Sequence, residues 1–203
     1  MRKLIKWTAV LMLILIVLGY ADLQLDLNRL QEDLIRIHVV ANSDSDQDQS
    51  NKILVRDAVL DYLKPVLSQF SSKEQVQQYL AEHLDELTGV VNSVLQSLKA
   101  DQQANITLKE EAFPMREYDT FSLPSGCYDS LRIEIGSGEG KNWWCVAFPA
   151  LCVPKTADAF CSIATSAGFD SKLSSTLTRE NGYEIRFFLL DCIGKLGNFF
   201  NKF

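Results

Sequence analysis

Hydrophobic and polar positions at the start of the folded part of the chain predict a strand and then a helix. Residues 34–41, LIRIHVVA, are rich in β-branched side chains and predict a buried strand. From Gln49 the apolar residues recur at helical spacing as far as Phe70, which predicts a helix with one core-facing side. Pro65 lacks an amide hydrogen, so we expect a kink or a stop near Lys64.

A second amphipathic pattern predicts another, longer helix. Ser71 and Ser72 are each followed three residues later by Glu74 or Gln75, which is the spacing of a capping box at a helix start. Apolar residues then keep helical spacing over 76–98, or about six turns. A short connection between two amphipathic helices predicts that they pack antiparallel.

The period changes from helical to alternating after about residue 104. Ile106 and Leu108 alternate with polar residues, and so do the apolar residues over 131–135, which predicts two half-buried strands. Residues 142–148, NWWCVAF, predict a further strand, joined to the preceding strand as a hairpin through GSGEGK, residues 136–141. We also expect a strand over 183–190 and a short helix over 191–200.

Together these elements predict an α+β fold. Two antiparallel helices from the first half would pack on a mainly antiparallel sheet from the second half, which the first strand joins, with an N-terminal export helix in front. The 203 residues, 47% of them hydrophobic, fit a single globular domain with an additional segment. The predicted division is a signal peptide or membrane anchor at 1–21, a linker or helical extension at 22–33, and one α+β domain at 34–203.

The N-terminal segment has the pattern of a membrane-targeting sequence. Arg2, Lys3 and Lys6 precede an uncharged, mostly apolar stretch over 7–21. A bilayer-spanning helix needs about 20 apolar residues, so this shorter stretch favours a secretory signal peptide, cleaved before Asp22. The alternative is an uncleaved membrane anchor. In both cases the basic end stays in the cytoplasm and the remainder is exported.

Charge and residue content exclude some classes of function. The net charge of −6 argues against nucleic-acid binding, which needs clustered Lys and Arg. Zinc sites need closely spaced cysteines or nearby histidines, and the two histidines, His38 and His83, lie far upstream of the cysteines. We therefore predict no metal and no cofactor.

In an exported protein, Cys145 and Cys152 are candidates for a disulfide that closes the turn at Pro149. The odd number of cysteines leaves one of them unpaired.

The aspartates at 44, 46 and 48 stand at alternate positions, as the first ligands of a calcium-binding EF-hand loop do. The loop is incomplete, because Gln49 replaces the glycine of its sharp turn and Val55 replaces its final glutamate. We interpret the stretch instead as a helix start, in which one of the residues 42–45 caps the helix and the later aspartates face its positive end.

Two further features leave alternatives open. A thiol hydrolase using Cys145 and His38 needs the thiol and imidazole within hydrogen-bonding distance, and nothing in the local sequence supports that arrangement. A histidine inside a strand is more commonly a hydrogen-bonded structural residue.

Strand alternation sends Trp143 and Trp144 to opposite faces of the sheet. One indole either packs in the core or stays exposed as a protein-binding anchor.

Two long blocks of the sequence, RIHVVANSDSDQDQSNKILVRDAVLDYL and GEGKNWWCVAFPALC, resemble the stage II sporulation protein R family of endospore-forming bacteria. The resemblance covers roughly residues 32–190 and includes Cys145 and Cys152, whereas Cys127, Cys161 and Cys192 are not typical of the family. The two blocks occur in the expected order, behind an export segment.

This resemblance implies a signalling role rather than catalysis. Members are made in the forespore, exported into the space between the two septal membranes, and needed to activate a membrane-bound aspartic peptidase in the mother cell. That peptidase cleaves the pro-sequence from sporulation sigma factor E. The expected partner is therefore the peptidase, with membrane contact through the N-terminal segment. A membrane-tethered structural domain of the envelope is a further alternative. The residues expected to contact the peptidase are Asn42, Ser43, Asp44, Arg56, Asp57, Trp143 and Trp144.

Overall fold

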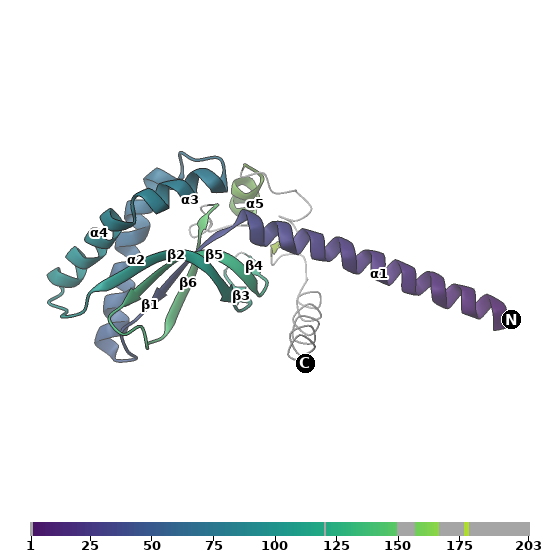
Figure 1. The fold of residues 1–203 in the computed structure, drawn as a ribbon, viewed down its shortest axis with the longest axis horizontal. Helices are drawn as coiled ribbons and strands as arrows, with labels where there is room; N and C mark the ends of the chain where they lie inside the picture. The colour runs from purple at the N-terminus through teal and green to yellow at the C-terminus, as the bar shows by residue number, and fades with distance from the viewer. Residues whose placement is uncertain (1, 120, 150–156, 167–176, 179–203) are drawn as a thin grey trace.

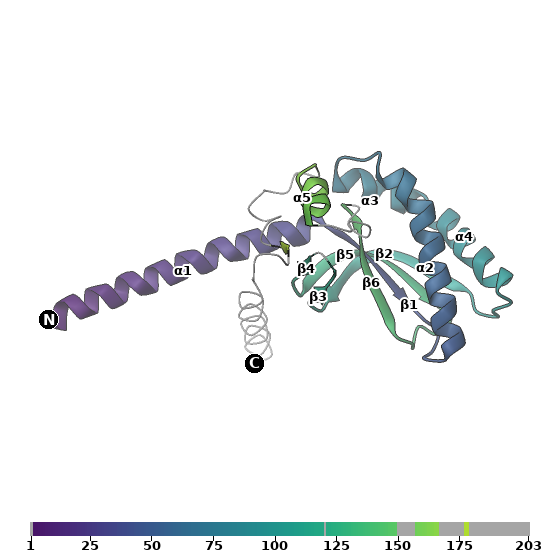
Figure 2. The same ribbon diagram turned by 180° about the vertical axis from the view of Figure 1, so that it is seen from behind.

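The computed structural model describes residues 2–119, 121–149, 157–166 and 177–178. The helices are α1 (Arg2–Asp33), α2 (Asp46–Leu67), α3 (Lys73–Glu82), α4 (Leu84–Ser97) and α5 (Ala157–Ser166). The strands are β1 (Ile35–Val40), β2 (Ala104–Phe113), β3 (Arg116–Glu117), β4 (Ser122–Leu123), β5 (Gly126–Ile135) and β6 (Asn142–Phe148). Helices α2, α3 and α4 lie on one side of the larger sheet, and α1 projects away from it (Figures 1 and 2).

The larger sheet has the strand order β2-β5-β1-β6. Strand β1 is parallel to β5 and antiparallel to β6, while β2 is antiparallel to β5. The predicted α+β class, the mainly antiparallel sheet and the participation of the first strand are therefore confirmed. All six residues of β1 are buried, as expected for an interior strand that is covered on both faces.

The predicted hairpin between β5 and β6 is wrong, because β1 lies between these two strands. Ile37 of β1 is in register with Leu131 on one side and with Cys145 on the other. The alternation of apolar and polar residues along a strand indicates which residues face the core, but it does not indicate which other strand lies beside it in the sheet. The connection from β5 to β6 therefore crosses the end of β1 and is not a tight hairpin turn.

Helix α2 begins where the acidic stretch predicts a helix start. The hydroxyl of Ser45 accepts a hydrogen bond from the Asp48 amide at 3.2 Å, which makes Ser45 the N-cap. The helix continues through Pro65 to Leu67, so a stop near Lys64 is wrong. Leu67 is buried in the helix-side core, and this packing outweighs the backbone hydrogen bond that the proline cannot make.

The predicted six-turn helix is two helices, α3 and α4, which are separated by His83. Ser72 caps α3 as predicted, accepting from the Gln75 amide at 3.4 Å. His83 has φ −116° and ψ 15°, and its Nδ1 lies 2.9 Å from the carbonyl oxygen of Tyr79. The buried residues Leu80 and Leu87 keep the helical period across this break, so the sequence pattern does not show it. Three helices, rather than two, cover this side of the sheet.

Buried side chains form one core on each face of the sheet. The helix-side core includes Ile35, Ile37 and Val39 of β1, Val55, Val59 and Leu63 of α2, Val91 and Leu95 of α4, and Leu131, Ile133 and Ile135 of β5. The core on the opposite face contains Leu30, Leu34, Phe113, Phe121, Leu123, Tyr128, Val146, Ala164 and Leu177. In β6, for example, Cys145 lies in the helix-side core and the next residue, Val146, lies in the core on the opposite face.

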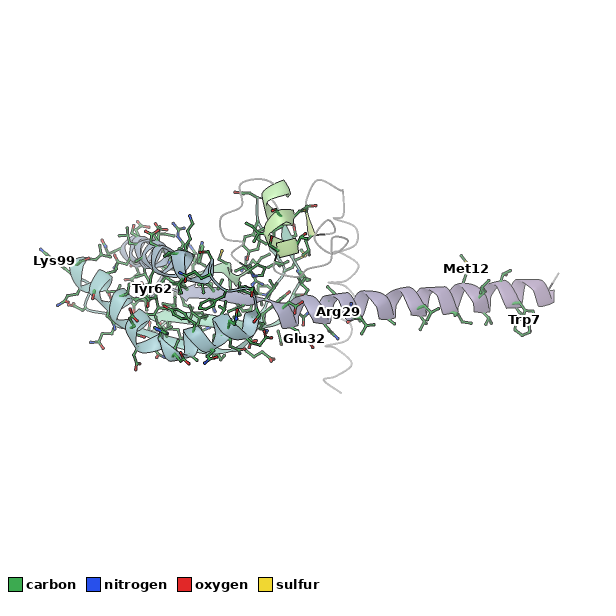
Figure 3. All side chains as sticks on the ribbon, turned by 90° about the horizontal axis from the view of Figure 1, so that it is seen from above. Trp7, Met12, Arg29, Glu32, Tyr62 and Lys99 are labelled. Carbon is green, nitrogen blue, oxygen red and sulfur yellow. The ribbon has the colours of Figure 1, made fainter. Side chains whose placement is uncertain are left out.

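Among the described residues, helix α1 enters a core of the domain at its C-terminal end. Leu30 and the following Leu34 are fully buried in the core opposite the helices. Farther out, Trp7 and Met12 are 73% and 67% exposed, and they lie on the part of the helix that extends beyond the domain (Figure 3). Among the residues that the structure describes, no helix has the length and apolar character needed to cross a membrane.

Some predicted features lie outside the described residues. They are the strand over 183–190, the helix over 191–200, Cys152 and Cys192.

Candidate partner-binding surface

The turn between β1 and α2 is held by side-chain hydrogen bonds to one buried carboxylate. Asp48 Oδ2 accepts from Asn42 Nδ2 at 2.9 Å and from Ser43 Oγ at 2.5 Å. These hydrogen bonds, the one from Ser43 first, lower the pKa of Asp48. The acidic stretch therefore starts a helix, as predicted. In the described part of the chain, no group of three or more His, Cys, Asp or Glu side chains is arranged to hold a metal ion.

This turn is also bonded to the loop at 136–141, which crosses the end of β1. Asp44 Oδ1 accepts from the Lys141 amide at 2.7 Å, and Asn42 Oδ1 accepts from the Ser137 amide at 3.0 Å. The amide of Gly140 donates to the Ala41 carbonyl oxygen at 2.9 Å. Two segments far apart in sequence therefore form one fixed surface at this end of the sheet.

Lys52 connects this surface to the next turn of α2. Its Nζ donates to the carbonyl oxygen of Lys141 at 2.9 Å and to Gln49 Oε1 at 2.7 Å. Burial lowers the pKa of Lys52. Sequence analysis did not identify this residue, because a lysine four positions after Asp48 in an amphipathic helix ordinarily faces solvent.

Arg56, one turn beyond Lys52, brings α2 and β6 together. Its guanidinium carbon lies 5.4 Å from the centre of the Trp143 ring, a cation–π distance, and its Nη2 lies 2.7 Å from Asp57 Oδ1. The Asp57 side chain is 51% exposed. We call the surface formed by six of the predicted contact residues the helix-start surface. Its members are Asn42, Ser43, Asp44, Arg56, Asp57 and Trp143. The structure thus brings six of the seven predicted contact residues into one continuous region.

Trp144, the seventh predicted residue, lies on the opposite face of the sheet, as strand alternation predicts. Its ring is stacked on His38 at 3.7 Å between centroids and meets Phe113 edge-on at 4.7 Å. The guanidinium of Arg116 lies over the same ring at 5.4 Å. Both tryptophans are half-buried, and a role of either indole as a protein-binding anchor stays a prediction.

A polar network around His38 occupies the sheet face opposite the helices. His38 Nδ1 lies 3.2 Å from Glu111 Oε2, and its Nε2 lies 2.9 Å from Asn142 Oδ1. Arg132 donates to Glu111 at 2.8 Å and to Glu134 at 2.6 Å. Burial lowers the pKa of His38 despite these partners. The structural interpretation of His38 is confirmed. The alternating polar residues of β1, β2 and β5 were the signal that could have predicted the network.

The structure does not support a thiol enzyme that uses Cys145 and His38. Cys145 is buried in the helix-side core, whereas His38 packs on Trp144 on the other face of the sheet. Cys145 is disulfide-bonded, which leaves no thiol to act as a nucleophile. Its partner lies outside the described residues, and the pairing with Cys152 stays a prediction. Cys127 and Cys161 are free.

Comparison with known proteins gives matches over most of the chain. Residues 31–158 match the family described as Stage II sporulation protein R (spore_II_R). The chain is 28% identical over 183 residues to Stage II sporulation protein R of Bacillus subtilis (strain 168), which covers 81% of this chain and 82% of the relative. No solved structure matches the chain.

Proposed function

Because this chain belongs to the stage II sporulation protein R family, we propose that it is an exported sporulation signal that activates a membrane-bound aspartic peptidase. The activated peptidase then removes the inhibitory pro-sequence from sporulation sigma factor E. The protein acts in the space between the forespore and mother-cell membranes. Membership of a sporulation family supports this function, and the resemblance described above supplies the peptidase and its substrate.

The N-terminal segment supports the export step of this proposal. Residues 1–21 combine a basic start with an apolar stretch, which is the pattern that export machinery recognises. In the structure, residues 2–21 belong to the part of α1 that projects away from the domain (Figure 1). The segment can therefore be engaged by a membrane, or be removed, without disturbing the core contacts of Leu30 and Leu34.

The observation that carries the proposed mechanism is the continuity of the helix-start surface. Its loops are fixed by the hydrogen bonds of Asp44 and Asn42, and its tryptophan is held beside Arg56. A fixed surface loses little conformational entropy when it binds. A protein that binds the active arrangement of a peptidase more tightly than the inactive one shifts the population toward the active form. Activation then needs no bond-breaking step by this chain.

Co-production in a non-sporulating host tests the function class. Three strains would carry the candidate peptidase and its pro-sigma substrate, together with the full chain, with a chain that lacks residues 1–21, or with neither. We expect cleavage of the pro-sequence only with the full chain, because only that form reaches the outer side of the membrane. Equal cleavage with the truncated, cytoplasmic chain would contradict export as part of the mechanism.

A charge reversal on α2 tests the helix-start surface. We expect Arg56→Glu to reduce activation by about tenfold or more, since it removes the cation beside Trp143 and places a carboxylate next to Asp57. Lys64→Glu is the matched control, because this exposed residue lies on the same helix and the charge change is identical. A folded Arg56→Glu protein that activates as well as Lys64→Glu would remove this surface from the contact.

A further inference from the structure

Arg36 is a charged residue at the centre of the fold. It lies in the interior strand β1 between Ile35 and Ile37, and its side chain is 0% exposed. Arginine stays protonated inside proteins, so the folded domain contains a buried positive charge. Replacing such a charge by an apolar residue of similar length ordinarily keeps or raises stability. The presence of arginine here therefore calls for a reason other than packing.

The surroundings of Arg36 are aromatic and leave part of its hydrogen-bonding capacity unused. The guanidinium carbon lies 4.1 Å from the centre of the Phe113 ring and 5.1 Å from that of Tyr128. Its Nη2 donates to the hydroxyl of Tyr118 at 2.6 Å. Within the described part of the chain, the buried Nε and Nη1 have no acceptor and Arg36 has no carboxylate within ion-pair distance.

A second unpaired cation lies close to Arg36. Arg116 of β3 is exposed, and its guanidinium lies over the Trp144 ring. The Trp144 ring contacts Phe113, and Phe113 also packs on Arg36. Burial is the main cause that lowers the pKa of Arg36, and the positive charge of Arg116 lowers it further. Across the described ranges, Arg116 has no ion pair either. Glu117 and Asp119 are close in sequence, yet no described carboxylate forms an ion pair with Arg36 or Arg116.

We propose that Arg36 and Arg116 form a binding site for a carboxylate of a partner protein, carried by an acidic segment of that protein. The aromatic rings of Phe113, Tyr128 and Trp144 supply the apolar contact around the charge. Arginine next to tryptophan and tyrosine is the composition typical of energetic hot spots in protein interfaces. The site lies on the sheet face opposite the helix-start surface. Only the identity of the partner as the peptidase rests on the proposed function.

The backbone around Arg36 favours a carboxylate over a phosphate group. Phosphate sites in proteins ordinarily combine a cation with the free amides of a helix N-terminus or a glycine-rich loop. Arg36 lies in the middle of β1, which is paired on both sides by β5 and β6, so the backbone amides there take part in the sheet. The free donors at the site are the side-chain nitrogens Nε and Nη1 of Arg36.

Access to Arg36 requires the Tyr118 side chain to move. Tyr118, which follows β3, covers the guanidinium through its hydroxyl and stacks on Phe121 at 4.6 Å. Phe121 and Leu123 of the β3 and β4 segment are buried in the core opposite the helices, so they stay in place. A carboxylate that replaces the Tyr118 hydroxyl at the guanidinium would therefore displace the half-buried Tyr118 side chain rather than open the main sheet.

Titration of the full chain in detergent tests this site without any peptidase. The probes are sodium acetate and an acetylated tetraglutamate peptide, with sodium chloride at matched ionic strength and sodium phosphate as comparators. The readout is the NMR resonance of the Arg36 Nε–H group. We expect a saturable shift with acetate and with the peptide but not with chloride. No saturable shift, or a response to phosphate alone, would overturn the proposal.

Two variants separate a ligand site from a structural charge. Arg36→Met keeps the length of the side chain in its aromatic surroundings, so we expect the acetate response to be lost while the melting temperature stays equal or rises. A melting temperature several degrees lower without any carboxylate present would show that the charge serves the fold and would overturn the proposal.

Arg116→Gln changes an exposed residue, so folding is preserved. We expect its affinity for the peptide to fall about tenfold, and an unchanged affinity would exclude Arg116 from the site.

Discussion

At the scale of single residues, Asp48 organises the turn on which the helix-start surface depends. Its carboxylate accepts from Asn42 and Ser43, and its amide donates to the N-cap Ser45. Asp46 lies in the same first turn of α2 but is exposed, with none of these side-chain contacts. The two aspartates therefore share the favourable position near the positive end of the helix, and only Asp48 also fixes the loop.

We expect Asp48→Asn to lower the free energy of unfolding by about 1–2 kcal/mol, because it weakens two charge-assisted hydrogen bonds and leaves a buried amide incompletely paired. Asp46→Asn is the matched control, and it should lower the free energy by roughly 0.5 kcal/mol or less, since it removes only an exposed charge at the helix end. Urea denaturation of both variants measures the difference. Equal losses would show that Asp48 acts only through the helix dipole.

The lowered pKa of Asp48 also predicts a dependence of stability on pH. The unfolded-state pKa of aspartate is about 3.9, and the hydrogen bonds from Ser43 and Asn42 place the folded-state value below it. The stabilisation is therefore complete above about pH 5 and is lost as pH falls from about 4 through the folded-state pKa. The difference in unfolding free energy between wild type and Asp48→Asn should shrink over this range. A difference that stays constant down to pH 2 would contradict the assignment.

At the scale of elements, the helix-start surface depends on how closely two loops approach each other. A Cβ at Gly140 would lie 2.3 Å from the carbonyl oxygen of Ser43, so no side chain fits there without moving the backbone. Gly136 and Gly138 of the same loop have φ of +60° and +64°, the left-handed region that glycine adopts at little cost. Glycines thus fix the crossing of this loop over the end of β1.

Two Gly→Ala substitutions should therefore have opposite effects. We expect Gly140→Ala to lower the free energy of unfolding by about 1–3 kcal/mol, because the added methyl group overlaps the backbone of the neighbouring loop. Gly89→Ala, on the open side of α4, should raise it by about 0.5–1 kcal/mol, since alanine has the higher helix propensity and nothing lies within 4 Å of its Cβ. Thermal or urea denaturation gives both values. A stabilising Gly140→Ala would contradict the close approach of the loops.

Local periodicity predicted most elements and missed how they connect. The strand at 34–41 and the helix start after the acidic stretch follow from residue pattern and capping chemistry, so their prediction was confirmed. The insertion of β1 between β5 and β6 was missed, because alternation does not encode the neighbouring strand. The break at His83 was missed because Leu80 and Leu87 are buried on both sides of it.

The candidate surface was predictable only in part for the same reason. Asn42, Ser43, Asp44, Arg56 and Asp57 were named together because they are close in sequence. Their contact with Trp143 needs the strand order that periodicity does not give. Arg36 and the network around His38 were not predicted as sites, because a polar residue in an apolar strand shows no partners until strands distant in sequence are placed beside it.

At the scale of the whole molecule, the protein divides into a projecting helix and a domain whose sheet carries a core on each face. Only the last turns of α1 enter a core, through Leu30 and the following Leu34, which are 1% and 0% exposed. Helices α2 to α4 cover the other face (Figure 2). The helix-start surface and the Arg36 site therefore lie on opposite sides of one sheet, and only the Arg36 site needs a covering side chain to move before a partner can reach it.

This arrangement predicts that two N-terminal truncations differ in stability. A chain that starts at residue 22 should melt within about 2 °C of the full chain, because it keeps Leu30 and Leu34. A chain that starts at residue 35 should melt roughly 10 °C lower, since each buried leucine contributes about 2–5 kcal/mol. Calorimetry of the two truncated chains measures this. Equal melting temperatures would show that the end of α1 is not part of the core.

We propose that this protein activates a peptidase by binding it and breaks no bond itself. Purified full chain would be titrated into membranes that contain the peptidase, and the rate at which the pro-sequence of sigma factor E is cleaved would be followed. We expect a rate that saturates with the concentration of the full chain, with Arg56→Glu needing about tenfold more protein to reach half of the plateau. Cleavage in membranes without the peptidase, or a rate that does not respond to the full chain, would contradict it.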